Sequence, residues 1–147
     1  MNADGADLMI KMMIKEEYKY SDITEKVIGC AMKVHRQMRN GFQELIYHRC
    51  LIIEFRKIAV PFLNEIELPI FYDDIEVGKR RVDFLIENRV IIEIKAVSEL
   101  TDSHLAQALN YLEALNLEIG LLINFGSKSL EVKRLINNKY RPSFRIK

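Results

Sequence analysis

The sequence predicts a single domain of the α/β class, a mixed β-sheet of the α+β type flanked by helices. Apolar residues recur at helical spacing in some segments, while others alternate in polarity or form short apolar runs, as strands do. A chain of 147 residues is long enough to bury a core. The chain order is helix at 21–38 and 42–57, strand at 60–72, 81–86 and 90–97, helix at 102–116, and strand at 118–125.

Composition and charge are those of a soluble globular protein, with 49% hydrophobic and 29% charged residues. The net charge of +1 provides no overall attraction to polyanions, so nucleic-acid binding would need a local basic patch. Residues 127–147 indicate such a patch, because this segment contains seven lysines and arginines and only one acidic residue, Glu131. Cys30 and Cys50 lack metal-ligand spacing and are expected to be reduced core thiols of a cytosolic protein.

The ends of the chain are poorly patterned. We expect an N-terminal tail over 1–20 that is open to disorder, a compact domain over 21–137 and a basic tail over 138–147. The apolar run 9–15 is too short for a membrane span and lacks a signal-peptide cleavage site, so we expect a cytoplasmic protein without a membrane partner. Met13 is an alternative natural start.

The stretch 81–97 (RVDFLIENRVIIEIKAV) is apolar enough to form two core strands, yet three charged residues lie within its apolar runs. A charge at a position that alternates as sheet interior is costly unless it is paired, bound to metal or used in chemistry. The residues are Asp83, Glu93 and Lys95.

A three-residue loop would bring the two acids together. The loop 87–89 suits a hairpin whose middle asparagine is left-handed, and Ile86 then pairs with Val90. Counting back along both strands, Asp83 falls opposite Glu93 on one face, roughly 5 Å away. A two-residue loop would place Asp83 on the other face, so the prediction depends on an odd loop or a bulge.

This arrangement suits metal-assisted phosphodiester hydrolysis. Two close carboxylates repel unless a cation lies between them, and Mg²⁺ is held by one or two carboxylates with waters and substrate phosphate. Lys95, on the same face, can orient a water or stabilise charge on a phosphate. The alternative is an ordinary cross-strand ion-pair cluster on a solvated sheet face.

The first helix is capped by Ser21 or Asp22 and ends at 39–41, where Arg-Asn-Gly stops the pattern.

The second helix, 42–57, brings Glu44 and Tyr47 within reach of one site, on a stripe that continues to His48 and Leu51. Glu44 is alternatively a first-turn acid that favours the helix dipole. We expect His35 and His48 to be helix-surface or satisfied core residues. The apolar surfaces are supplied by Ile23, Val27, Cys30, Ala31, Val34 and Met38 in the first helix, and by Phe42, Leu45, Ile46, Cys50, Ile53 and Phe55 in the second.

The strand over 60–72 is expected at a sheet edge, because its prolines cannot donate to a ladder. The pairs 73–74 and 77–78 mark turns into the central hairpin. The cationic cluster Lys79, Arg80 and Arg81 can hold a phosphate backbone, although a solvated strand end explains it equally well.

The third helix is capped by Thr101 or Asp102. Its polar stripe of His104, Gln107 and Tyr111 can face the proposed site, and solvated helix surface is the alternative. The run 118–125 is expected to be a central strand buried on both faces, and 130–136 can add an edge strand.

Four motifs in this order resemble the PD-(D/E)XK nuclease superfamily, and within it the small bacterial group of GxxExxY proteins. The resemblance covers about 23–136. The matching segments are Gly41-Phe42-Gln43-Glu44-Leu45-Ile46-Tyr47 after Val34-His35, Val82-Asp83-Phe84 with Glu93-Ile94-Lys95-Ala96, Gln107 with Tyr111, and Leu121 to Gly126. Two departures are Arg39-Asn40 in place of the usual Gly-Pro, and the lack of a proline before Asp83.

The resemblance implies a restriction-endonuclease-like core of order αβββαβ. It also implies that Asp83 and Glu93 bind Mg²⁺ or Mn²⁺, that Glu44 supports the metal or its water, and that Lys95 positions the attacking water. Gln107 and Tyr111 would place the lysine region or the nucleic-acid backbone, and Arg81 belongs to the substrate-binding surface proposed above.

The function predicted is a metal-dependent nuclease acting on DNA or, as the alternative substrate, on RNA. The main alternative keeps the fold as a catalytically weak or silent binding subunit that works as a homodimer or with a partner protein. A small-molecule enzyme is disfavoured because no phosphate-cradling or cofactor motif is present.

Overall fold

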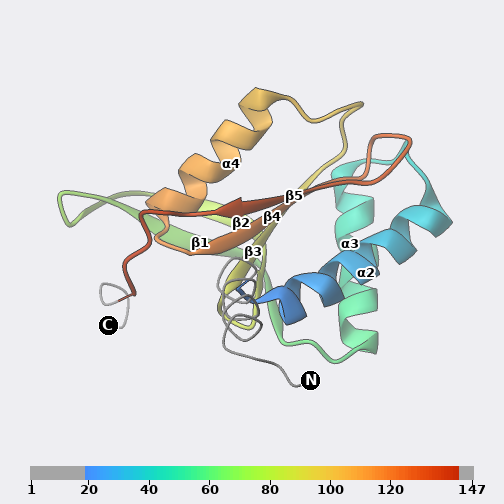
Figure 1. The fold of residues 1–147 in the computed structure, drawn as a ribbon, viewed down its shortest axis with the longest axis horizontal. Coiled ribbons are helices and arrows are strands. Elements are labelled where there is room, and N and C mark those ends of the chain that lie inside the picture. Colours follow the sequence, from blue (N-terminus) through green and yellow to red (C-terminus); the bar gives the residue numbers. More distant parts are fainter. Residues whose placement is uncertain (1–18, 143–147) are drawn as a thin grey trace, which may run out of the picture.

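The structure, a computed structural model that describes residues 19–142, is one mixed sheet with helices on both faces (Figure 1). This confirms the predicted fold class and element order, and the expected extra edge strand is present. The expectations for the N-terminal tail lie almost wholly outside the described residues. The elements are α2 (Ser21–Met38), α3 (Glu44–Lys57), β1 (Phe62–Tyr72), β2 (Ile75–Ile86), β3 (Val90–Lys95), α4 (Asp102–Ala114), β4 (Ile119–Asn124) and β5 (Glu131–Ile136).

The strand order is β1-β2-β3-β4-β5. Strands β3 and β4 are parallel and joined by α4, while the other neighbouring pairs are antiparallel. The crossover places α4 on one face of the sheet, and α2 and α3 lie on the opposite face (Figure 1). Within residues 19–142, no helix combines the length and the apolar character needed to cross a membrane.

The core has two layers, one on each face of the sheet. Strand β4 is buried along its whole length, as predicted. In α2, the predicted apolar residues are buried from Ile23 to Val34, and Met38 is half-buried. The α4-side cluster comprises Leu85, Ile91, Ala108, Leu112, Leu122 and Leu135. The α2/α3-side cluster includes Ile23, Val27, Leu51, Phe55, Phe84, Ile92 and Leu121.

The buried side of helix α3 matches the prediction only in part: Phe55 is buried as predicted, and Ile46 and Cys50 are half-buried. Tyr47, His48 and Leu51 face the core, whereas Leu45 and Ile53 are exposed. Apolar residues occur all around this helix, so their spacing does not select one face. Ring packing selects it instead: the Tyr47 ring stacks on Phe125 with centroids 4.7 Å apart.

Tyr47 also holds the junction between α2 and α3 closed. Its hydroxyl donates to the carbonyl of Arg39 at 2.5 Å and accepts from the amide of Phe42 at 3.2 Å. The turn passes through positive φ at Arg39 (62°) and Gly41 (118°), a conformation that glycine adopts readily. Arg39 stands where the usual Gly-Pro has glycine, so the junction closes here at a cost in backbone strain. Tyr47 has a structural role here and lies in the core.

The helix starts differ from expectation in one case. The N-cap of α2 is Tyr20, with φ of 61° and no side-chain cap bond, so neither Ser21 nor Asp22 caps it; both already lie within the helix. The cap of α4 is Thr101, as predicted: its side chain accepts from the amide of His104, whose ring accepts from the Thr101 amide in return. His104 therefore serves the cap.

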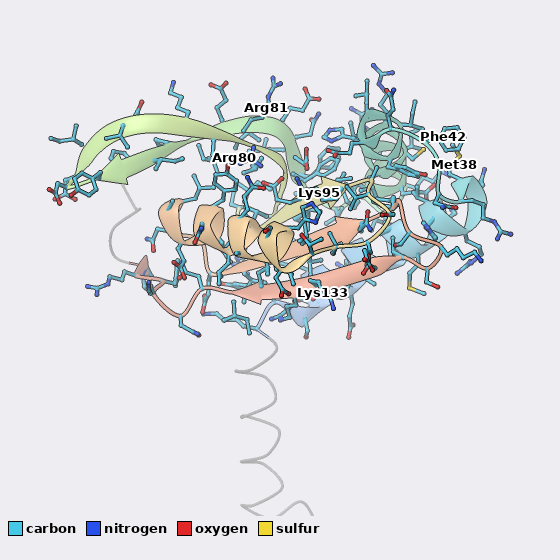
Figure 2. The ribbon with its side chains drawn as sticks, turned by 90° about the horizontal axis from the view of Figure 1, so that it is seen from above. Met38, Phe42, Arg80, Arg81, Lys95 and Lys133 are labelled. Atoms are coloured by element: carbon cyan, nitrogen blue, oxygen red, sulfur yellow. The ribbon has the colours of Figure 1, made fainter. Side chains whose placement is uncertain are left out.

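The β1–β2 hairpin extends away from α2 and α3 (Figure 2). Strand β1 is an edge strand, as its prolines predicted. Its turn is at Asp73 and Asp74, both at positive φ. The second predicted turn, at 77–78, is wrong: both residues lie within β2, where Ile70 pairs with Gly78 and Phe71 with Glu76. Val77 is thus the extra residue of a bulge, which resembles a turn in sequence.

The end of β3 is fixed by buried Asn124 of β4. Its amide oxygen accepts from the Val97 amide and its nitrogen donates to the Val97 carbonyl, both at 2.9 Å. The same nitrogen donates to the Glu131 carboxylate at 2.8 Å, which also accepts from the Leu100 amide. Gly126 completes this clamp, because a Cβ there would overlap the main chain of Val97.

We predict that Gly126→Ala destabilises the fold by about 1–3 kcal/mol, because the methyl group must displace backbone. Gly29→Ala is the control, since Gly29 lies in α2 and a methyl group added there would meet nothing within 4 Å. It is expected to stabilise by roughly 0.5–1 kcal/mol, the helical preference of alanine. Urea unfolding of both variants checks this; the same sign for both would contradict it.

Candidate active site

The central hairpin has the predicted register. Ile86 pairs with Val90, and the ladder continues to Phe84 and Ile92. The three-residue loop forms as expected, with Asn88 at φ of 59° and its neighbour Glu87 also at positive φ. The next pair in this register is Asp83 with Glu93, which the ladder no longer includes. The two acids therefore lie where the strands stop pairing.

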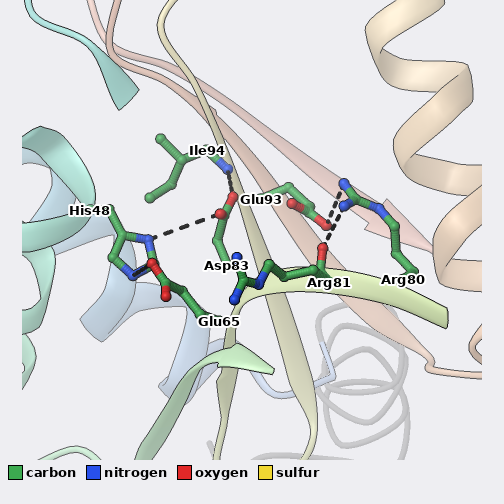
Figure 3. A network of polar contacts seen from close by, with 7 residues as sticks. All are labelled: His48, Glu65, Arg80, Arg81, Asp83, Glu93 and Ile94. Carbon is green, nitrogen blue, oxygen red and sulfur yellow. Dashed lines mark hydrogen bonds and ion pairs between the residues drawn. The ribbon is translucent and has the colours of Figure 1, made fainter. Parts of the chain in front are cut away.

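The side chain of Asp83 accepts a main-chain hydrogen bond at the point where the ladder between β2 and β3 ends. Its Oδ2 accepts the main-chain amide of Ile94 at 2.8 Å. Its other oxygen, Oδ1, lies 3.9 Å from Nδ1 of His48 on α3. Asp83 thus sits between His48 on one side and Glu93 with Arg80 on the other (Figure 3). One carboxylate oxygen is fixed by the backbone, and the other faces the site.

Glu93 is buried, with 6% of its surface exposed. Burial raises the pKa of Glu93 to about 8, and the negative charge of Asp83 adds to the rise. The positive charges of Arg80 and Lys95 offset part of that effect. Glu93 Oε1 lies 3.4 Å from Nη2 of Arg80. Arg80 and Lys95 therefore do not supply enough positive charge to keep the pKa of Glu93 near its ordinary value.

Lys95 ends β3, two residues beyond Glu93, and is half-buried. Residues two apart on a strand share a face, so Lys95 and Glu93 are neighbours, as predicted. Lys95 pairs in register with Asn124, the residue that clamps the following segment. The position of the lysine backbone is accordingly fixed from β4.

The sequence favours Arg81 of the cationic cluster as the site residue, whereas the structure places Arg80 against Glu93. Arg81 is exposed, while the Arg80 guanidinium lies 4.2 Å from the ring centroid of Tyr111 on α4 and contacts Glu93. Figure 2 places Arg80 beside α4. Tyr111, predicted to face the site, is joined to it through this contact.

An irregularity in β1 and β2 explains why Arg80 faces α4. Phe84 belongs to the α2/α3-side cluster, so strict alternation would place Arg80 on that side too. Phe62 and Ile66 of β1 are four residues apart, so a regular strand would place them on the same face of the sheet. Phe62 instead packs on the α2/α3 side and Ile66 on the α4 side, so the alternation of side chains reverses between them. Glu65, opposite Asp83 in register, has φ of 51° and is missing from the ladder. Sequence alternation alone does not reveal this change.

His48 is the second residue that sequence reasoning undervalued. It is buried as one expectation allowed, but its Nε2 has no hydrogen-bond partner, so it is not a satisfied core residue. The ring stacks on Phe84 with centroids 4.3 Å apart, and Nε2 lies 4.0 Å from the carboxylate of Glu65. His48 lies one turn after Glu44, and its position on the stripe with Tyr47 was the available signal.

The remaining predicted residues, Glu44 and Gln107, make no recorded contact with the pair of acids in the part of the chain that the structure describes. Glu44 is exposed at the first position of α3, and Gln107 is exposed on α4, one turn before Tyr111. Among residues 19–142, no three His, Cys, Asp or Glu side chains form a group able to hold a metal ion. Glu44 therefore does not complete a three-ligand site with Asp83 and Glu93 in this structure.

The pair Asp83 and Glu93 nevertheless fits a hard divalent cation. The ion Mg²⁺ takes one or two protein carboxylates and keeps waters and substrate phosphate as its other ligands. Mutual repulsion and burial, which raise the pKa of Glu93, are the conditions that a divalent cation relieves. The donor set is thus of the right chemistry.

The model of the PD-(D/E)XK nuclease superfamily matches residues 21–135. The chain belongs to this superfamily. Proteins of the PD-(D/E)XK superfamily are generally hydrolytic nucleases that use divalent metals, which implies a nucleic-acid substrate. No curated protein sequence matches the chain significantly.

The fold is similar to the crystal structure of SSO0001, with a TM-score of 0.50 and 23% sequence identity. The similarity covers 63% of this chain and 49% of that one, so the chain spans about half the length of its structural relative. This likeness supports a restriction-endonuclease-like fold for this PD-(D/E)XK protein and extends no further than the fold.

We predict that stability without metal falls as pH rises through the range set by Glu93. Its folded pKa of about 8 exceeds its ordinary value of 4.5, so the folded protein binds the extra proton between these values. Stability from this group is complete below about pH 4.5 and is lost by about pH 8, with a slope of at most about 1.4 kcal/mol per pH unit.

Urea unfolding in chelator at several pH values measures this slope. Glu93→Gln should flatten it, while Glu99→Gln, which changes an exposed acid, should leave it unchanged. Equal slopes for the wild type and Glu93→Gln would show that Glu93 is not the group responsible.

Proposed function

We propose that this protein is a metal-dependent nuclease that hydrolyses phosphodiester bonds of DNA, with RNA as the alternative substrate. The observation that carries the proposal is the Asp83–Glu93 pair at the end of the β2–β3 ladder, with Lys95 on the same strand face. The finer assignment to the GxxExxY group is also a proposal, supported by the closed junction that Gly41 and Tyr47 form.

Each residue has a role that follows from its position. Asp83 and Glu93 would hold Mg²⁺ or Mn²⁺, which supplies a water of lowered pKa and charge neutralisation at the phosphate. Asp83 can present Oδ1, because Oδ2 is fixed by the Ile94 amide. Lys95 stabilises negative charge that develops on the phosphate and orients the attacking water. Glu44 would act through water from the start of α3.

The substrate backbone is expected on the α4 side of the sheet. Arg80 faces α4, so Arg81 and Lys79 lie on the opposite face of β2, where they are exposed and can contact phosphates that extend beyond the α4 side. Gln107 is exposed on α4, on the side of the helix that Tyr111 shares. A backbone lying between α4 and β2 would pass over Glu93 and Lys95.

A second candidate is a catalytically weak or silent binding subunit of the same fold. Two observations favour it. Among the described residues, no three His, Cys, Asp or Glu side chains are grouped so that they could hold a metal ion, and Glu93 is already in an ion pair with Arg80. Calorimetric titration with Mn²⁺ separates the two functions, because no binding at millimolar metal would favour the silent subunit. A homodimer or a partner protein would then supply what this chain lacks.

We predict that Lys95→Ala lowers cleavage at least about 100-fold, since it removes a charge that acts on the transition state. Asp83→Ala should do the same by removing a metal ligand. Lys26→Ala is the matched control, because Lys26 is exposed on α2, which lies on the face of the sheet opposite α4, and should retain full activity.

The assay compares labelled single-stranded, duplex and branched DNA, and single-stranded RNA, with Mg²⁺ or Mn²⁺. Thermal unfolding of each variant establishes that the fold is intact. Full activity in purified Lys95→Ala or Asp83→Ala would remove the mechanism, and no metal-dependent cleavage of any substrate by the wild type would favour the silent subunit.

A further inference from the structure

Arg80 makes three contacts that are unusual for a residue on a strand. Its guanidinium lies 4.2 Å from the centroid of the Tyr111 ring, its Nη2 lies 3.4 Å from Oε1 of Glu93, and its Nη1 donates to the main-chain carbonyl of Arg81. Figure 3 shows its side chain reaching Glu93 from the side opposite His48. Arg80 therefore contacts the carboxylate of Glu93, which is a metal ligand in the proposed function.

The charge on Arg80 serves a need that a metal ion would also meet. A buried carboxylate beside a second one requires a nearby positive charge, because desolvation is costly. The Glu93 side chain is 8% exposed, so few groups can reach it. Among the described residues, Arg80 is the cation that forms an ion pair with this carboxylate. A metal on Glu93 and a guanidinium in contact with it would repel each other.

The way in which Arg80 is held permits it to leave. Its Nε is buried without a hydrogen-bond partner, and its contact with Glu93, at 3.4 Å, is longer than a strong charge-assisted hydrogen bond. Its side chain is 30% exposed, so a path to solvent is open. The Tyr111 ring provides a surface along which the guanidinium can slide while it keeps a cation–π contact.

We propose that Arg80 is an exchangeable counter-ion, which offsets part of the cost of a charge on Glu93 before metal binds and moves to a phosphate of the nucleic acid once metal binds. The proposal rests on the proposed function, since it takes Glu93 as a metal ligand. It assigns to Tyr111 the role of supporting Arg80 in both positions. A guanidinium suits a phosphate well, because its donors match two phosphate oxygens.

The first consequence concerns metal affinity. Removing the positive charge with Arg80→Gln should tighten Mn²⁺ binding, by about tenfold for a unit charge some 6 Å from a divalent ion in a water-like medium. Arg81→Gln is the matched control: it removes the same charge from the next residue, which is exposed, and should change the affinity much less. Isothermal titration calorimetry with Mn²⁺ alone measures both.

The second consequence concerns nucleic acid. In the Lys95→Ala background, which prevents cleavage, binding of a labelled duplex is measured against salt with Mg²⁺ and again in chelator. Arg80→Gln should reduce the slope of log K against log salt by about 0.9, one phosphate contact, with Mg²⁺. In chelator it should leave the slope unchanged, because Arg80 is then held on Glu93. Arg81→Gln should reduce the slope under both conditions.

The outcomes are distinct. Weaker or unchanged Mn²⁺ binding by Arg80→Gln would overturn the proposal, because Arg80 would then only position Glu93; an equal slope change with and without metal would do so too. Arg80→Lys keeps the charge and should bind Mn²⁺ nearly as the wild type does, which separates loss of charge from misfolding. No Mn²⁺ binding by the wild type would instead refute the proposed function.

Discussion

The site depends on the point at which β2 and β3 stop pairing. The ladder ends at Phe84 and Ile92, and the Asp83 carboxylate accepts the Ile94 amide in place of a main-chain carbonyl. A buried amide without a partner is costly, so this hydrogen bond stabilises the separation of the strands. Where the strands separate, Asp83 lies near His48 of α3, and Glu93 contacts Arg80, which packs against Tyr111 of α4.

Much of this arrangement could be predicted from the sequence. The loop 87–89 and the alternation on either side of it fix the register, because a slip of one residue would turn every apolar side chain to the wrong face. Asp83 and Glu93 follow from that register by counting. The edge position of β1 followed from its prolines, and the burial of β4 from its continuous apolar sequence. Each of these features is determined by local chemistry.

The features that could not be predicted arise where two rules compete. Strict alternation on β2 favours Arg81, and only the left-handed Glu65 on the neighbouring strand reveals that Arg80 turns toward Tyr111. Helix α3 carries apolar residues on every side, so the contact of His48 with Phe84, distant in sequence, decides which face is buried. Both outcomes depend on tertiary contacts, which periodicity within one element does not contain.

The segment that carries Lys95 is held more firmly than the side chain of Arg80, and this difference suits the proposed roles of the two residues. On the Lys95 side, Asn124 bonds the main chain of Val97 in both directions and Gly126 leaves no room for movement. On the Arg80 side, one donor lacks a partner and the ion pair is long. A group that stabilises developing charge must be in place before the reaction, because reorganisation would cost part of its effect. A group that must yield to an incoming cation can be effective only if it is held weakly. The fold supplies the rigid support from a parallel strand neighbour and the weak one from an aromatic ring across the sheet face.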